Sequence, residues 1–190
     1  MFDTLKSNLE QKNYSVRVFR TGAEAVDYLA ETITGATVAF GGSMTLEELG
    51  LYDRLAETNA VLWHWRRPEG GSAKAVLTAS RNASVYICSV NAIAETGELV
   101  NIDGNGNRVG ESCFGHERVY FVVGRNKITR TLDAALRRAR EIAAPLNAQR
   151  LSGAASAANV DRICRVTTIF NAAPFMAKYE VVLIDEDLGF

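Results

Sequence analysis

The stretch that decides the fold is residues 36–49, ATVAFGGSMTLEEL, where an apolar run meets two glycines and a polar segment. Residues 36–40 are almost entirely apolar, as expected for a strand that is covered on both faces in a parallel sheet. A loop of small residues, 41–43, follows at once, and Thr45 and Glu48 have the spacing of a helix capping box. The stretch therefore predicts a strand, a glycine loop and a helix N-terminus in direct succession.

The alternation of strands and helices continues in both directions along the chain. Upstream, Leu5 and Leu9 indicate a short amphipathic helix, and a strand over 15–20 precedes a helix from Thr21, which has capping-box spacing to Glu24. Downstream, apolar runs and helical periodicity predict strands at 61–65, 84–90 and 119–123, with helices at 74–82 and 132–143. The predicted fold class is α/β, a mostly parallel sheet with helices on both faces, in a single domain over residues 1–190.

The last third of the chain is less regular. The helix at 132–143 is expected to stop before Pro145, because the residue before a proline disfavours helical geometry. Residues 151–160 are rich in Ala, Ser and Gly and predict a connecting loop. Two late strands, 165–170 and 181–184, are expected to be antiparallel or to lie at a sheet edge.

A second informative stretch is residues 91–108, NAIAETGELVNIDGNGNR, in which Glu95 stands at a strand-to-turn junction. Residues 99–102 and 108–109 are the expected arms of a β-hairpin insertion with a polar tip between them, because Asp-Gly and Asn-Gly favour the turns that join two strands. The tip serves either as a turn alone or as part of a site. Arg108, at its edge, is the residue best placed to add function.

Composition argues against several classes of protein. The 21 Lys and Arg residues face 22 Asp and Glu, and a net charge of -1 argues against a basic nucleic-acid interface. No segment approaches the roughly 20 apolar residues of a membrane span, and the N-terminus lacks a signal-peptide pattern, so we expect a cytoplasmic protein without membrane contact. Cys88, Cys113 and Cys164 form no Cys-x-x-Cys pair and His64 and His116 stand apart, so we predict reduced thiols and no metal site.

Candidate site residues follow from the sheet. Ligands of open parallel sheets bind beyond the carboxyl ends of the strands, and free amides at a glycine loop suit a phosphate or a carboxylate. Tight-turn, helix-cap and surface roles remain open for the same residues. The chain has neither the lysine of a phosphate-binding loop nor a full Gly-x-Gly-x-x-Gly, so no nucleotide class is indicated. The expected ligand-binding residues are Gly41, Gly42, Ser43, Thr45, Asn91, Arg108, Arg125, Asn126 and Lys127.

Five blocks of sequence carry a family resemblance. They are Gly41-Gly42-Ser43-x-Thr45-Leu46-x-Glu48-Leu49-Gly50, Asn91-Ala92-Ile93-x-Glu95-x-Gly97, Asn101-Ile102-Asp103-Gly104-x-Gly106-Asn107-Arg108, Gly124-x-Asn126-Lys127-Ile128 and Ala144-Pro145-x-Asn147-Ala148. Together they resemble the lactate-utilisation, or LUD-domain, family in its short single-domain branch. The resemblance implies a fold similar to ribose-phosphate isomerase, glucosamine-phosphate isomerase and coenzyme A transferase. It also implies a role beside iron-sulfur partner proteins in a bacterial system that oxidises L-lactate to pyruvate.

The chain departs from these relatives in one segment. Relatives carry several cysteines where residues 152–161 of this chain have none. We therefore expect no iron-sulfur cluster and no cofactor in this chain.

Two functions remain in competition. In the first, the protein is an accessory module that binds a small anionic metabolite or a partner subunit such as an iron-sulfur oxidoreductase; the tryptophans and Tyr52 are also consistent with a homodimer. In the second, the protein is an enzyme, and Glu95 is the catalytic nucleophile or general base toward a coenzyme A thioester or a sugar-phosphate-like substrate. A structural role for Glu95, as a cap of its turn, is the third alternative.

Overall fold

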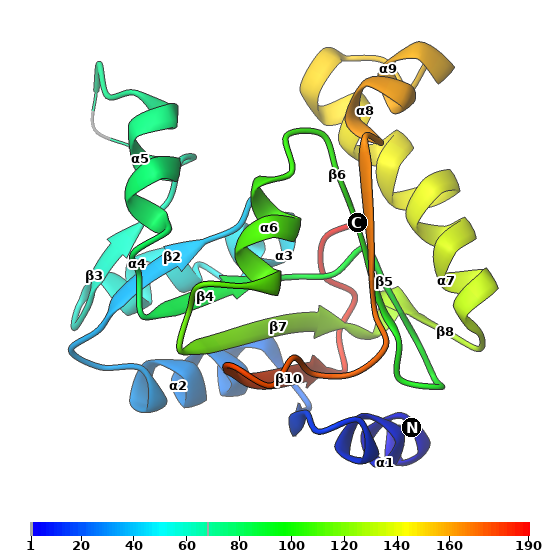
Figure 1. Ribbon diagram of the computed structural model, residues 1–190, viewed down its shortest axis with the longest axis horizontal. Helices are drawn as coiled ribbons and strands as arrows, with labels where there is room; N and C mark the ends of the chain where they lie inside the picture. Colours follow the sequence, from blue (N-terminus) through cyan, green and yellow to red (C-terminus); the bar gives the residue numbers. More distant parts are fainter. Residues whose placement is uncertain (1, 68) are drawn as a thin grey trace.

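The structure, a computed structural model, describes residues 2–67 and 69–190. Its main sheet has six parallel strands in the order β1, β10, β7, β4, β2, β3 (Figure 1). β7 lies inside this sheet and is buried from Val119 onward, as its continuous apolar sequence predicts. The bounds are β1 Ser15–Phe19, β10 Lys178–Ile184, β7 Arg118–Gly124, β4 Val85–Cys88, β2 Thr37–Phe40 and β3 Ala60–Leu62.

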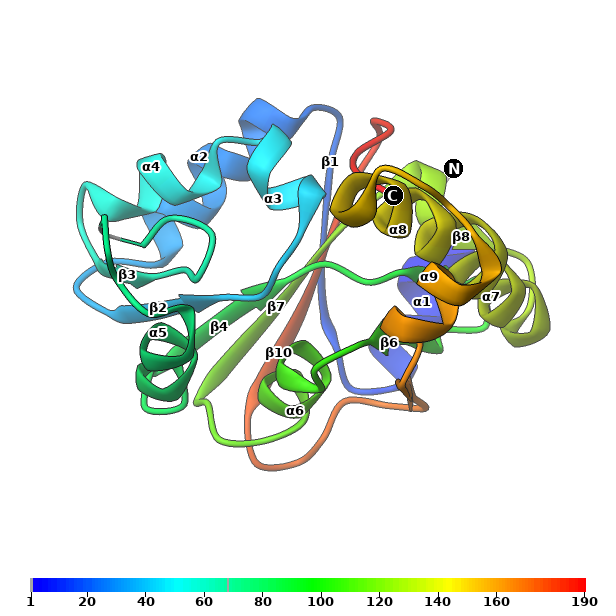
Figure 2. The ribbon, with the colours of Figure 1, turned by 90° about the horizontal axis from the view of Figure 1, so that it is seen from above.

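Helices cover both faces of the main sheet. Figure 2 shows α2, α3 and α4 on one side and α5 and α6 on the other. Thr21 accepts a hydrogen bond from the amide of Glu24, whose carboxylate accepts one from the amide of Thr21, so the predicted capping box of α2 is confirmed. The bounds are α2 Gly22–Thr32, α3 Met44–Glu48, α4 Leu51–Ala56, α5 Ala73–Ser80 and α6 Asn107–Cys113.

A second, four-stranded sheet packs against the main one. Its order is β8 (Ile128–Thr129), β5 (Ala92–Ala94), β6 (Leu99–Asp103), β9 (Val166–Phe170). One face of this second sheet packs into the same hydrophobic core as one face of the main sheet. Helix α1 (Asp3–Gln11) packs into that core as well. The opposite face carries Ala92, Ala94 and Val100, which pack against Ala135 of α7 (Leu132–Arg138) and against Ala139, the residue that follows α7. This second sheet places the ends of β6 and β8 beside the carboxyl ends of the main strands.

The polar segment after β6 is not a hairpin tip. The hairpin in this region is β5–β6, and the predicted return arm at Arg108 and Val109 is instead the start of α6, so that part of the prediction is wrong. The physical reason is Asp103, whose carboxylate accepts hydrogen bonds from the amides of Arg108 and Val109 and thereby caps the helix. Gly106, at φ 79°, supplies the left-handed residue that the turn into α6 requires.

The helix predicted to end before Pro145 continues through it. α7 passes into a π-helical segment, η2 (Ala139–Ala143), and then into α8 (Ala144–Ser152). A proline inside an α-helix removes a hydrogen bond and crowds the preceding turn. The wider π turn directly before Pro145 accommodates the ring and lets the helical rod extend.

The segment predicted as a loop over 151–160 is also partly helical. Ser156 caps α9 (Ala157–Ile163) by accepting a hydrogen bond from the amide of Asn159. Only Val160 of this helix is buried, so its sequence carries no apolar period from which a helix could be predicted. Of the two late strands, β9 lies at an edge as expected, whereas β10 is an inner strand parallel to both neighbours.

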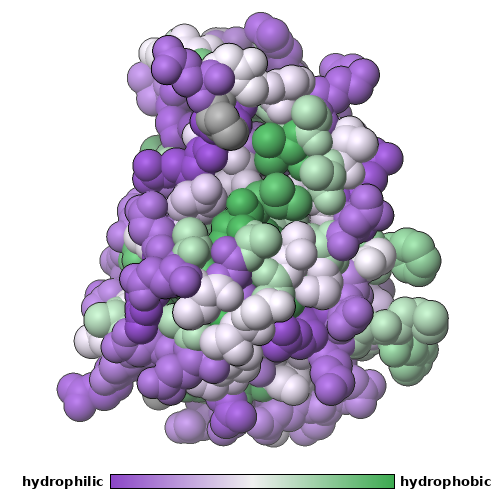
Figure 3. All heavy atoms as spheres, turned by 90° about the vertical axis from the view of Figure 1, so that its left-hand side faces the viewer, coloured by the Kyte–Doolittle hydropathy of each residue, from purple (hydrophilic) through white to green (hydrophobic). Residues whose placement is uncertain are grey.

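The predicted α/β class with a mostly parallel sheet is confirmed. Figure 3 shows the side of the molecule that carries α5 and the edge strand β3, where apolar side chains gather between hydrophilic margins. Across the described residues, no helix is both long and apolar enough to cross a membrane.

Candidate functional site

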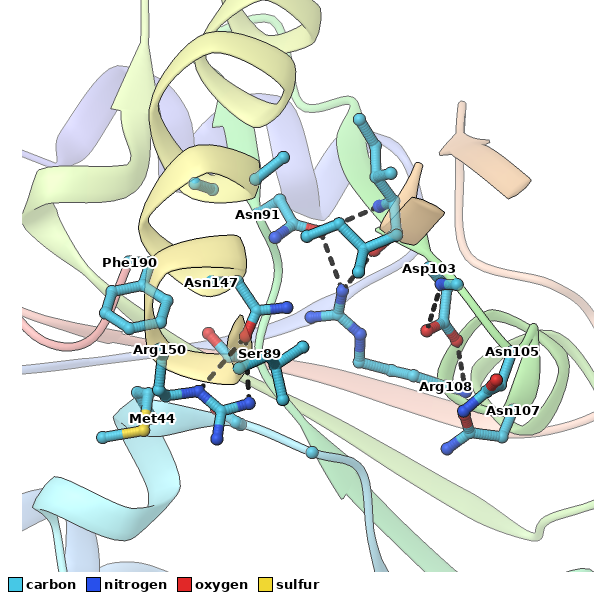
Figure 4. A pocket seen from close by; sticks show the side chains of 18 of the residues that line it. Met44, Ser89, Asn91, Asp103, Asn105, Asn107, Arg108, Asn147, Arg150 and Phe190 are labelled. Carbon is cyan, nitrogen blue, oxygen red and sulfur yellow. Dashed lines mark hydrogen bonds between the residues drawn. The ribbon is translucent and has the colours of Figure 1, made fainter. Parts of the chain in front are cut away.

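A cavity of about 380 Å³ opens where the two sheets meet α8 and α9. The loops after β2, β4 and β7 contribute Ser43, Ser89 and Lys127 to its wall. Figure 4 shows Arg108 from α6 and Arg150 from α8 on two sides of this space, with Asn91 and Asn147 beside them. The cavity therefore lies at the carboxyl ends of the parallel strands, where ligands of open α/β sheets bind.

Positive charge predominates in the wall of the cavity. The cationic side chains that line it are Arg108, Lys127, Arg150 and Arg162, and the carboxylate that lines it is Asp103. Asp103 is occupied in capping α6. Cations that outnumber the acids around them attract an anionic ligand. The attraction is stronger in a cavity that is shielded from water, because the effective dielectric constant is lower there.

Arg108 is the best-defined of these cations. Its Nη2 donates to Oδ1 of Asn91 at 2.8 Å and to the carbonyl oxygen of Ile102 at 2.6 Å. Among the described residues no carboxylate lies within 4 Å of its guanidinium. Gly41 makes this position available, since a Cβ there would stand 3.3 Å from Cγ of Arg108 and 2.8 Å from Cβ of Cys88. The guanidinium is thus oriented by neutral groups and keeps its charge for a ligand.

Lys127 lies at the inner end of the cavity and is almost fully buried, with 3% exposed. Its Nζ donates to Oγ1 of Thr45 at 2.7 Å and to Oγ of Ser89 at 2.9 Å. Burial, and then the neighbouring charges of Arg108 and Arg138, lower the pKa of Lys127 to about 7. The amine therefore exists at neutral pH partly without its charge.

Arg138 supports this inner wall from behind. Its guanidinium donates to the carbonyl oxygen of Asn126 at 2.8 Å and to that of Asn91, and burial lowers its pKa. The first bond ties α7 to the turn that carries Lys127, and the second ties it to the segment beside Arg108. Arg138 is therefore a positioning residue for two of the cavity's cations.

The outer wall is built from α8 and from the loop after β3. Arg150 donates to Oδ1 of Asn147 at 3.2 Å from Nε and 2.9 Å from Nη2, and its guanidinium carbon lies 4.6 Å over the ring of Trp65. Next to Trp65, His64 also lines the cavity; its Nδ1 is buried, and burial lowers its pKa. Phe190 also lines the cavity, and Figure 4 shows it on the same side as Asn147 and Arg150.

The structure brings together about half of the residues predicted to bind a ligand. Gly42, Ser43, Asn91, Arg108 and Lys127 line the cavity. Behind this lining stand Gly41, which makes room for Arg108, and Thr45, which holds Lys127. Distant positions in the sequence thus meet at one rim, as the parallel sheet requires.

Other predicted residues lie elsewhere. Arg125 is exposed and pairs with Asp185 and Asp187, at 3.4 Å and 2.9 Å. The amide side chain of Asn126 holds the backbone of Leu188 and Gly189.

Glu95 does not line the cavity. It belongs to the β5–β6 turn, where its carbonyl oxygen accepts a hydrogen bond from Asn8 and its amide donates one to the carbonyl oxygen of Thr129.

The glycine loop also differs from the expected helix cap. Ser43 rather than Thr45 caps α3, accepting a hydrogen bond from the amide of Leu46 at 3.3 Å. The hydroxyl of Thr45 instead donates to the carbonyl oxygen of Leu188. Because α3 has only five residues, its dipole is short, and the side-chain cations are the main source of positive charge.

Several lining residues were missed by sequence reasoning. Asp103 and Asn147 stand inside blocks that carry the family resemblance, so a signal for both was present. Arg150 and Arg162 lie on α8 and α9, two helices that the sequence did not predict. No group of three or more His, Cys, Asp or Glu side chains within residues 2–67 and 69–190 is arranged to hold a metal ion.

Comparison with known proteins agrees with this fold. The family model described as "LUD domain" matches residues 2–184 of the chain. A solved structure, a DUF162 family protein from Deinococcus radiodurans, is similar with a TM-score of 0.57 and 15% identity, covering 95% of this chain and 94% of that one. At this identity the likeness shows the fold alone. Among curated proteins no match was found.

Proposed function

Because the chain belongs to the LUD-domain family, we propose that it binds a small carboxylate metabolite of lactate metabolism, such as L-lactate or pyruvate, in this cavity. The observation that carries the proposal is the wall charge: the arginines Arg108, Arg150 and Arg162 stand against one carboxylate, Asp103, which is already used as a helix cap. A carboxylate ligand would supply the missing negative charge.

Arg108 is the residue assigned to the carboxylate. An arginine presents several N–H donors in one plane, and each donor that its own neighbours leave open can bind a carboxylate oxygen. Asn91 and the carbonyl of Ile102 occupy only Nη2 of Arg108. The volume of about 380 Å³ is at the lower end of the range for small-molecule sites, and it accommodates a three-carbon acid together with water.

A role for partner proteins is part of the same proposal. From the family resemblance, we propose an iron-sulfur oxidoreductase as the partner of this chain in lactate oxidation. A second copy of this chain or another subunit could cover the face on which Figure 3 shows apolar side chains between hydrophilic margins.

The enzymatic alternative through Glu95 has less support from the geometry. Glu95 does not line the cavity, and the hydrogen bonds of its backbone fix the β5–β6 turn. A catalytic carboxylate has to reach the substrate, so the position of Glu95 favours the structural alternative.

Thermal-shift and calorimetric titrations test the proposed function. L-lactate and pyruvate should each raise the melting temperature, because a ligand at 100 times its Kd stabilises the folded state by about 2.7 kcal/mol. Lactamide, which has the shape of lactate without the charge, should give no shift. Arg108→Gln should weaken the affinity by roughly ten- to a hundredfold, the range expected for the loss of a charged hydrogen-bond pair.

Arg130→Gln is the matched control, since Arg130 is exposed and outside the cavity and loses the same charge. Its affinity for lactate should equal that of the wild type. Equal shifts with lactate and lactamide, or equal losses in the two variants, would contradict binding through Arg108.

A further inference from the structure

The hydrogen bonds around Lys127 specify one free position on its nitrogen. The hydroxyl of Thr45 donates its proton to the carbonyl oxygen of Leu188 at 3.1 Å, so toward Lys127 its oxygen can only accept. The oxygen of Ser89 is the second acceptor, at 2.9 Å. A neutral amine has two N–H donors and one lone pair. With both N–H groups bound to hydroxyl oxygens, the lone pair remains for the cavity that Lys127 lines.

The surroundings of Lys127 favour the neutral amine. The titratable and charged groups whose charges act on its nitrogen are Arg108 of α6, Arg138 of α7, Glu48 of α3 and Cys88 of β4, and of these Glu48 and Cys88 act to raise its pKa. The two arginines disfavour a third positive charge, and burial does so most strongly. Burial also raises the pKa of the Cys88 thiol to about 12, which leaves that neighbour neutral.

We propose that Nζ of Lys127 reacts with the carbonyl carbon of a small 2-oxo acid whose carboxylate is held by Arg108, forming an imine. This inference rests on the proposed function, since it uses the same cavity and the same anion site. It narrows the ligand class from small carboxylates in general to those with a carbonyl next to the carboxylate. A 2-hydroxy acid such as lactate occupies the site without reacting.

The bond changes balance without an added oxidant or reductant. The lone pair of the amine forms the C–N bond, and the electrons of the carbonyl π bond move to oxygen. One amine proton passes to that oxygen, which gives a carbinolamine. The second N–H proton then leaves with the hydroxyl group as water, and the C=N bond forms. Ser89, in contact with the amine, is placed to relay a proton.

Reductive trapping tests the imine. The full-length chain is incubated with pyruvate and sodium borohydride, which reduces an imine to a stable secondary amine, and the modified lysine is located by peptide mass spectrometry. The adduct should lie on Lys127, be lost in Lys127→Arg and be suppressed by excess L-lactate. Lys74, exposed on α5, is the internal control and should stay unmodified, because it does not line the cavity that holds the 2-oxo acid.

The pH dependence of trapping gives a second readout. The yield on Lys127 should rise through pH 7, where the amine loses its proton, and the labelling of Lys74 gives the background at each pH. Calorimetric binding of pyruvate is measured in parallel. Retained binding without an adduct on Lys127, or equal labelling of Lys127 and Lys74, would overturn the imine and leave the proposed binding function intact. Absence of both binding and adduct would overturn both.

Discussion

Arg125 and Lys127 are two residues apart on one short turn, η1 (Arg125–Lys127), and they lie in opposite environments. Arg125 is exposed and has two aspartates as partners, whereas Lys127 is buried at the inner end of the cavity with hydroxyl partners. A 3₁₀ turn has three residues per turn, so positions two apart point about 120° from each other. Both cations therefore cannot face one ligand.

The two cations differ in the kind of partner that compensates their positive charge. Arg125 forms ion pairs with two aspartates at the surface, where such pairs contribute little to stability. Lys127 and Arg138 are withdrawn from water, and their partners are neutral oxygens. Removal of an inner cation should consequently change stability, its pH dependence or ligand chemistry, and removal of Arg125 should change none of these.

Lys127→Met should have the largest effect, on the pH dependence of stability. The pKa of Lys127 is about 7 in the folded chain, against about 10.4 for an ordinary lysine, so between these values the unfolded chain binds more protons. The free energy of unfolding then rises with pH by about 1.4 kcal/mol per unit from this residue, or roughly 4 kcal/mol between pH 7 and pH 10.

Denaturant unfolding of the wild type and of Lys127→Met, measured from pH 7 to pH 10, tests this effect. The wild type should gain stability relative to Lys127→Met as pH rises, and the change common to both proteins reports all other groups. A difference that stays constant from pH 7 to pH 10 would show that Lys127 is charged in the folded state.

Arg138→Met should come next, with a loss of about 3 kcal/mol in the free energy of unfolding. The carbonyl oxygens of Asn91 and Asn126 would each lose a charged donor in a buried place. Arg137→Met, an exposed neighbour on the same helix, is the control and should melt close to the wild type. If the two variants melted alike, Arg138 would not hold the inner wall.

Arg125→Gln should have the smallest effect. The guanidinium is solvent-exposed and its two aspartate partners are free to rehydrate, so the melting temperature and the affinity for lactate should match the wild type within the scatter of the measurements. A clear loss of affinity in this variant would place Arg125 in contact with the ligand and remove the contrast with Lys127.

The sequence predicts well those parts of the molecule in which each local signal is unambiguous. Continuous apolar runs identify β2, β4 and β7 of the main sheet, and the Thr21 to Glu24 spacing identifies the start of α2. The parallel sheet then explains why Ser43, Asn91 and Lys127 meet. The sequence does not show which residues of one loop face the cavity and which face water, because the direction of each side chain depends on the turn type.

Tertiary contacts decide the rest. Arg150 lies on α8 and Arg162 on α9, in which only Val160 is fully buried, so no local signal places either arginine on the outer wall. Pro145 is a reliable sign of a helix end in a regular helix, and only the π segment before it makes the extension to α8 feasible. The local sequence around Glu95 is the same whether its carboxylate serves a turn or a binding site. Only the packed structure places it outside the cavity.

The most direct test of the central claim is a crystal structure of the protein grown with L-lactate. We predict electron density for the lactate carboxylate against the guanidinium of Arg108, inside the cavity lined by Ser89, Lys127 and Arg150. Lactate bound outside this cavity, or an empty cavity at a lactate concentration that saturates binding in solution, would contradict the claim.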